Sequence, residues 1–207
     1  MPHVAWFSQL FENTSGGGVL LALPFECLAD WDGTGDDYET VTQDIDQFLL
    51  HPLRHNFGLF INEDDGIHEA HWFRLPGREE LYLAVWSAWP DPSRPTQPND
   101  MKLLAKNWEQ RKDPRQSWLP DQLSRTDHPW ERLEPPLHVD SGVLLLLHGE
   151  GLPVKARFAK PRAIAQHGQV VPVGLAPGRY QIETVVLNEL PDGEHLCLVC
   201  RWVAIGE

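Results

Sequence analysis

The feature of this sequence that most constrains its fold is a series of short apolar segments, each ended by glycine, proline, asparagine or aspartate. The clearest are at 57–61, 68–75 and 80–89, and they are separated by Asn62-Glu63-Asp64-Asp65-Gly66 and Pro76-Gly77-Arg78. Short β-favouring segments separated by such residues are typical of antiparallel strands joined by turns. We therefore expect these three segments to form a meander of antiparallel strands.

The N-terminal part opens with a glycine turn and a strand. Ser15-Gly16-Gly17-Gly18 precedes the apolar run Val19-Leu20-Leu21-Ala22-Leu23, which is typical of a strand buried on both faces and ends at Pro24. A helical turn is expected at 25–31 and a loop at 32–37. The apolar spacing in 38–50 is compatible with either a short helix or an irregular strand.

The middle of the chain is rich in proline, unlike the strand-forming segments before it. Four of them fall between Trp89 and Pro98 and indicate a connector. The spacing of apolar residues predicts a helix at 101–111, whereas the polar, proline-rich stretch 113–136 predicts an irregular arm along the surface. Strands are expected again at 138–147, 154–158, 169–173, 179–187 and 195–204.

These patterns predict a mainly β protein with one or two short helices and a proline-rich connector. Its strands could form two antiparallel β lobes or one large β-sandwich. The corresponding division is an N-terminal β lobe at 1–90, the connector with a short helix at 91–136 and a C-terminal β lobe at 137–207. The two lobes could equally pack as one domain.

The two halves of the chain share sequence. Ser15-Gly16-Gly17-Gly18-Val19-Leu20-Leu21 is similar to Ser141-Gly142-Val143-Leu144-Leu145, and Leu81-Tyr82-Leu83-Ala84-Val85-Trp86 is similar to Leu196-Cys197-Leu198-Val199-Cys200-Arg201-Trp202. A duplicated β lobe and chance similarity between apolar strands explain these matches about equally well.

The charge of the chain limits its partners. Its 30 Asp and Glu against 17 Lys and Arg give a net charge of −13. This argues against nucleic acid and against an anionic membrane, because both repel a polyanion. An acidic surface can attract a basic partner such as a nuclease, although acidity also serves simply to keep a protein soluble. The nine Trp residues are consistent with a large β core and with aromatic anchors at an interface.

Several features predict a soluble, cytoplasmic protein. The start at Met1 has neither the basic segment nor the long apolar run of a signal peptide. Apolar stretches such as 143–147 are far shorter than the roughly 20 residues that span a bilayer. Three Cys, an odd number, are typical of reduced thiols rather than of a disulfide framework.

The histidines give only a weak metal-binding pattern. His51 and His55 are four residues apart, as in a helical metal site, but Pro52 lies between them. If 68–75 is a strand, His68 and His71 point to opposite faces and do not chelate one ion. We therefore expect no metal site.

Other catalytic patterns are equally weak. Cys197 and Cys200 form a Cys-x-x-Cys, but inside an apolar strand their sulfur atoms point to opposite faces, which predicts buried, inert thiols. The glycine run at 16–18 lacks the Gly-Lys-Ser/Thr ending of a phosphate loop, and the sequence contains no Gly-x-Ser-x-Gly nucleophile turn. We expect no catalytic residue, no cofactor and no enzyme activity.

Two stretches carry a resemblance to a known family. Ser15-Gly16-Gly17-Gly18-Val19-Leu20-Leu21-Ala22-Leu23-Pro24, followed by Leu28-Ala29-Asp30-Trp31-Asp32-Gly33 and Asp37-Tyr38, resembles the opening of the bacterial polymorphic-toxin immunity protein 21 family. Leu175-Ala176-Pro177-Gly178-Arg179-Tyr180 is similar to a segment near the end of such proteins and of bacterial nuclease inhibitors.

The resemblance implies a non-enzymatic immunity protein that binds and inhibits a cognate toxin, for example a nuclease with a basic surface, through protein–protein contacts. The candidate partner-binding residues are Trp31, Asp32, Asp36, Asp37 and Tyr38 after the first strand, and Glu63, Asp64 and Asp65 on a neighbouring turn. Trp31 and Tyr38 are equally compatible with a place in the core.

Two other functional classes remain open. One is a small-ligand or carbohydrate-binding β-sandwich in which several Trp residues line a groove. The other is a metal-dependent hydrolase that uses the region from His51 to His71.

Overall fold

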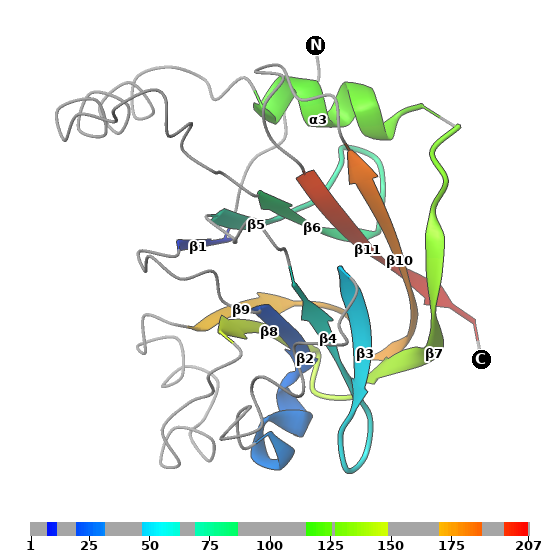
Figure 1. The fold of residues 1–207 in the computed structure, drawn as a ribbon. Helices are drawn as coiled ribbons and strands as arrows, with labels where there is room; N and C mark the ends of the chain where they lie inside the picture. Colours follow the sequence, from blue (N-terminus) through cyan, green and yellow to red (C-terminus); the bar gives the residue numbers. More distant parts are fainter. Residues whose placement is uncertain are drawn as a thin grey trace, which may run out of the picture.

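The structure, a computed structural model, describes residues 8–11, 20–31, 47–62, 69–86, 115–125, 127–148, 170–187 and 197–206. In these residues the strands form two antiparallel sheets (Figure 1). The larger sheet has the order β1-β5-β6-β11-β10-β7 and the smaller has the order β3-β4-β2-β8-β9. The strands are β1 (Ser8–Phe11), β2 (Leu20–Pro24), β3 (Phe48–Pro52), β4 (Phe57–Ile61), β5 (Glu69–Phe73), β6 (Leu81–Trp86), β7 (Glu131–Val139), β8 (Val143–His148), β9 (Val170–Gly174), β10 (Gly178–Leu187) and β11 (Cys197–Ile205).

The chain is mainly β, as the sequence predicts, and its sheets pack face to face as a β-sandwich. One cluster of apolar side chains from both sheets fills the space between them, including Trp72 and Trp202, whose ring centroids are 5.1 Å apart. Burial of this apolar area is the main favourable term in folding, at about 25 cal/mol per Å². Strands from 1–90 and from 137–207 occur in both sheets, so the two ranges share this core.

Each sheet also buries its outer face, because a short helix covers it (Figure 1). On the smaller sheet, η1 (Phe25–Asp30), a 3-10 helix where the sequence predicts a helical turn, packs Cys27 and Leu28 against β2. On the larger sheet, α3 (Arg115–Leu123) packs Leu119 and Leu123. Neither of the two helices that the structure describes has the length and apolar character needed to cross a membrane.

The prediction that 113–136 is irregular is wrong for most of that stretch, because α3 and the start of β7 lie within it. The helix contains Pro120, and it is only nine residues long. An isolated helix of this length is marginal in water, so the burial of Leu119 and Leu123 on the sheet stabilises it. The helix predicted at 101–111 and the strand predicted at 154–158 lie outside the described residues.

Strand β7 contains Pro135 and Pro136, which is possible because it lies at the edge of the larger sheet. Its pairing with β10 is interrupted between Tyr180 and Ile182, opposite the two prolines. There the side-chain Nε2 of Gln181 donates a hydrogen bond to the backbone oxygen of Leu133 at 2.7 Å. This side chain supplies a bond across the interruption in the ladder.

The predicted meander is also only partly right. Strands β5 and β6 are antiparallel neighbours in the larger sheet, but β4 lies in the smaller sheet between β3 and β2. Four of the five residues of β4 are buried, with Leu59 and Ile61 in the central core and Phe60 in the outer cluster. A strand buried on both faces has no alternating pattern that would indicate its sheet.

The predicted strand at 138–147 is two strands, because the chain crosses from one sheet to the other at a turn after Val139. Gly142 has φ of +70° at this turn, a conformation that favours glycine. The Glu26 carboxylate accepts hydrogen bonds from the backbone N–H groups of Asp140 (2.5 Å) and Ser141 (3.3 Å). η1 and the crossing turn are thereby joined.

The order of the strands is two-fold symmetric. In the larger sheet, β6 and β11 form the central pair, and outward from it β5 corresponds to β10 and β1 to β7. In the smaller sheet, β2 and β8 form the central pair, and β4 corresponds to β9. The similar sequences noted above fit this symmetry, because Ala22 lies opposite its own counterpart Leu146, and Ala84 opposite its counterpart Val199. This correspondence favours duplication over chance. The segment that would correspond to β3, 149–169, lies outside the described residues.

Candidate functional site

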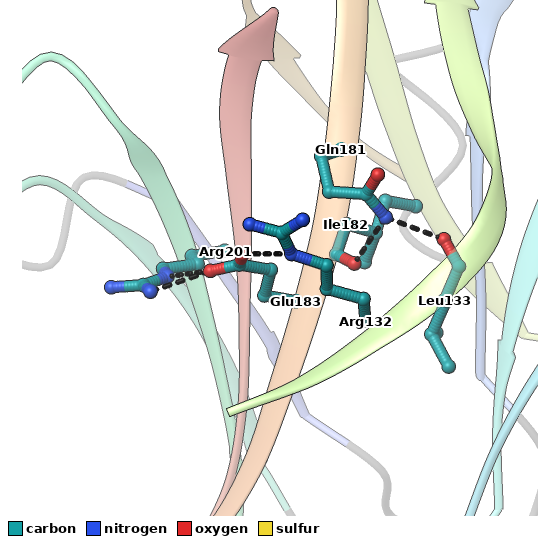
Figure 2. Close-up of polar contacts among 6 residues, drawn as sticks. All are labelled: Arg132, Leu133, Gln181, Ile182, Glu183 and Arg201. Atoms are coloured by element: carbon teal, nitrogen blue, oxygen red, sulfur yellow. Dashed lines mark hydrogen bonds and ion pairs between the residues drawn. The ribbon is translucent and has the colours of Figure 1, made fainter. Parts of the chain in front are cut away.

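A row of charged side chains crosses the outer face of the larger sheet (Figure 2). Glu183 on β10 lies directly opposite Arg201 on β11 and Arg132 on β7. Its Oε2 accepts a hydrogen bond from Arg201 Nε at 2.7 Å and lies 2.5 Å from Arg201 Nη2 in an ion pair, and its Oε1 accepts a hydrogen bond from Arg132 Nε at 3.1 Å. The carboxylate is thus held by two guanidinium groups.

Burial differs along this row. The Glu183 side chain is 9% exposed and that of Arg201 20%, whereas that of Arg132 is 71% exposed. The Arg201 guanidinium also lies 3.8 Å from the centroid of the Trp130 ring, a cation–π contact. Trp130 is in the segment between α3 and β7, so this arrangement fastens that segment and the edge strand to the middle of the sheet. We assign it a structural role.

Trp31, a candidate partner-binding residue, lies in the core. It follows η1, is 3% exposed, and its ring lies 5.2 Å from Phe60 and 6.0 Å from His51 between ring centroids. Its indole is thus part of the apolar layer beneath η1, which agrees with the core alternative for this residue. The other candidates, Asp32, Asp36, Asp37, Tyr38, Glu63, Asp64 and Asp65, lie outside the described residues.

The structure does describe the points at which the two acidic segments join the fold. The segment 32–46 leads into Gln47, directly before β3, and 63–68 begins after Asn62, directly after β4. The backbone N–H of Asn62 donates a hydrogen bond to the backbone oxygen of Gln47 at 3.1 Å. The two acidic segments are therefore attached to adjacent residues at one end of the β3–β4 hairpin.

The histidines do not gather in the parts of the chain that the structure describes. His51 lies on β3 against Phe60, at a centroid distance of 5.2 Å, whereas His55 is exposed in the turn beyond it. His71 is buried on β5 in the larger sheet, and His68 lies outside the described residues. Within the described ranges, no three or more His, Cys, Asp or Glu side chains are placed to hold a metal ion.

All three cysteines are buried thiols, and the two of the Cys-x-x-Cys point to opposite faces of β11, as predicted. Cys200 lies in the central core and Cys197 in the outer cluster beneath α3. Burial raises the pKa of Cys200, and it raises the pKa of Cys27 to about 12, with a further contribution from the nearby Glu26 and Asp30 carboxylates. Thiols with raised pKa values are poor nucleophiles at neutral pH.

Most of the tryptophans that the structure describes are core residues. Trp31, Trp72, Trp86 and Trp202 are buried, and Trp118 and Trp130 are partly buried beside α3. The side chain that sequence reasoning missed is Glu183, because its partners are 18 and 51 residues away and only strand register brings them together. The one signal for this role in the sequence was the presence of an acidic residue, Glu183, within the largely apolar strand β10.

The chain matches no protein-family model, and no curated protein or solved structure is significantly similar to it.

Proposed function

We propose that this protein is an immunity protein that binds a cognate bacterial toxin in the cytoplasm and inhibits it without catalysing a reaction. The proposal starts from the resemblance of 15–38 to the immunity protein 21 family and from the net charge of −13. An acidic inhibitor suits a toxin with a basic surface, such as a nuclease, because complementary charge accelerates association and favours the correct partner.

The observation that carries the proposal furthest is the hydrogen bond between Asn62 and Gln47. The segment 32–46 contains six carboxylates and 63–68 contains three, and neither contains Lys or Arg. The bond joins the end of one segment to the start of the other, so negative charge from two separate parts of the sequence is attached at one place. A rigid sandwich that carries such charge is well suited to hold a basic partner.

Trp31 has a different role in this proposal from the one expected from sequence. Because its ring is buried between η1 and the smaller sheet, it supports the start of the acidic segment from beneath. Asp32, Asp36, Asp37 and Tyr38, with Glu63, Asp64 and Asp65, remain the proposed contacts.

The test is co-expression with a basic, toxin-like protein sought among the products of neighbouring genes, combined with purification of the tagged protein. We expect growth to be rescued and a stoichiometric complex to be recovered. Reversing the charge of the acidic segment with Asp32→Lys, Asp36→Lys and Asp37→Lys should abolish both, since it replaces attraction by repulsion.

The matched control makes the same change in charge elsewhere. Asp121→Lys, Glu131→Lys and Glu134→Lys alter three exposed residues on α3 and on the first half of β7, whereas the hydrogen bonds between β7 and the hairpin lie at His138. This triple variant should still rescue growth. Free protein without rescue, or equal loss in both triple variants, would argue against the proposed surface.

A further inference from the structure

Among the strands that the structure describes, β3 is an edge of the smaller sheet and pairs with β4 on one side only. In an antiparallel ladder, alternate residue pairs exchange both backbone hydrogen bonds. Asn62 bonds to Gln47 at one end of the hairpin, and Leu53 and Asn56 bond to each other at 2.7 and 3.3 Å at the other. Because hydrogen-bonded and non-hydrogen-bonded pairs alternate, the bonds at these two ends set the phase of the ladder, that is, which residue pairs of β3 and β4 exchange backbone hydrogen bonds.

The phase determines which backbone groups of β3 are left outside the sheet. With the observed register, Leu49 pairs with Phe60 and His51 with Gly58 through backbone bonds. The N–H and C=O groups of Phe48 and Leu50 therefore point away from β4. Among the described residues no backbone group bonds to these four.

The side chains of β3 add an apolar contact beside this open edge. Leu49 is 40% exposed, and it is the exposed large hydrophobic residue of the described part of the chain. Phe48 and Leu50 pack against the central core and hold the strand in place. An exposed edge with free backbone groups and an apolar side chain is a template for a further strand.

Two other edge strands are blocked by proline. β7 contains Pro135 and Pro136. On β9, the bond from Leu175 N to Gly142 O at 3.0 Å sets the ladder phase so that Pro172 and Gly174 occupy outward positions. Prolines at edges remove the donors that an added strand needs, which is a common protection against edge pairing. The first three residues of β3 have no such protection.

The hydrogen bonds between the neighbouring strand β7 and the hairpin lie at one end of the hairpin. β7 contacts β3, and the hydrogen bonds that join β7 to the hairpin lie at the turn, between the Asn56 side chain and the backbone of His138. Pro52 and the turn are therefore the end of the hairpin that β7 holds, and Phe48, Leu49 and Leu50 lie toward the other end.

Charge indicates what kind of strand this edge would accept. The sequences that lead into β3 and out of β4 are acidic and lack Lys and Arg, whereas the exposed Arg54 lies in the turn at the opposite end. A segment beside β3 would thus meet negative charge at the Gln47 end. Basic residues there and an apolar residue against Leu49 would complement the edge.

We propose that β3 is a docking edge, and that an extended, basic segment of the toxin adds to it as a further strand beside Phe48, Leu49 and Leu50. This inference rests on the proposed function for the identity of the partner. The recognition itself, backbone pairing to β3 plus attraction of basic residues to the acidic sequences that flank the hairpin, does not depend on which protein supplies the strand.

A synthetic peptide tests the docking edge without the toxin. The probe is a capped octapeptide of alternating lysine and valine, and the readout is backbone hydrogen exchange of the full chain. We expect the amides of Phe48 and Leu50 to exchange about tenfold more slowly when the peptide is bound. A glutamate–valine octapeptide should give no protection. Protection elsewhere, or none with either peptide, would overturn the proposal.

Two variants locate the effect on β3. Leu50→Pro removes an outward donor and should weaken peptide binding by about tenfold or more, since a backbone hydrogen bond is lost and the ring obstructs pairing. Gly174→Pro places a proline in the matching outward position of β9 and should leave binding unchanged. If Leu50→Pro does not fold, Leu49→Lys, at an exposed position, should weaken binding by charge repulsion instead.

Outcomes for the two proposals are separable. Amide protection by the lysine–valine peptide together with failed growth rescue would support strand addition and contradict the immunity function. Growth rescue that Leu50→Pro and Leu49→Lys leave unchanged would support immunity and overturn strand addition.

Discussion

At the scale of single residues, Glu183 is important because it accepts hydrogen bonds from arginine side chains on both neighbouring strands of the larger sheet. It joins three strands, and through Arg201 and Trp130 it also fastens the segment before β7. Removing one partner of a buried ion pair costs more than the pair contributes, because the remaining charge is left uncompensated.

Glu183→Gln should therefore lower the free energy of unfolding by about 2 kcal/mol or more, with most of the loss from Arg201, because Arg132 is largely exposed. Urea denaturation measures this change. Glu131→Gln, an exposed carboxylate on β7, is the control and should shift stability by less than about 0.5 kcal/mol. Equal stability of the two variants would refute the role assigned to Glu183.

The Cys27 thiol gives a prediction for alkaline pH. Its pKa is about 12 in the folded protein, raised from an ordinary value near 9 by burial and nearby carboxylates. The unfolded chain therefore ionises first, so this thiol leaves stability unchanged below pH 9 and reduces it as pH rises from 9 to 12. Between pH 10 and 11, the wild type should lose about 1 kcal/mol more stability than Cys27→Ala. Parallel pH profiles of the two proteins would contradict this.

At the scale of elements, the crossing between β7 and β8 depends on one glycine. Gly142 has φ of +70°, and a Cβ there would lie 3.3 Å from the backbone oxygen of Leu175. Gly142→Ala should cost about 1–2 kcal/mol, measured by thermal or urea denaturation. Gly174→Ala, with ordinary φ and no atom within 4 Å of its Cβ, should be neutral within about 0.5 kcal/mol. A reversed ranking would show that this turn is not strained by a side chain.

The elements also show how far the sequence predicts this fold. Apolar runs ended by turn residues located β4, β6 and β10 closely, because burial and turn chemistry are both local properties. Sheet membership of β4 was not predictable, since its residues are buried on both faces. β7 was missed because its prolines exclude a central strand but are compatible with an edge strand.

Of the candidate site, the sequence showed the two acidic segments. The hydrogen bond that joins their ends could not be predicted, because it depends on the register of the β3–β4 hairpin.

At the scale of the whole molecule, the two halves are interleaved. The central pairs β2–β8 and β6–β11 each join one strand from each half, so neither sheet can form from one half alone. Urea unfolding followed by tryptophan fluorescence and by far-UV circular dichroism should therefore give one coincident transition, as expected for a cooperative domain. Two separate transitions would mean that the halves are independent units.

The acidic character of the chain also belongs to the whole molecule. If the proposed function holds, the net charge of −13 should make association with a basic toxin fast at low salt, and the association rate constant should fall as ionic strength rises, because screening shortens the range of attraction. In the proposed function, one molecule of this chain occupies one molecule of toxin.

The most direct test of the central claim is a titration of a purified toxin-like protein, sought among the products of neighbouring genes, with increasing amounts of this chain and with toxin activity as the readout. We expect activity to fall linearly and to reach its minimum at one equivalent, as for a tight stoichiometric inhibitor. Inactivation by far less than one equivalent would indicate an enzyme, and unchanged activity at excess inhibitor would contradict the immunity function for this toxin.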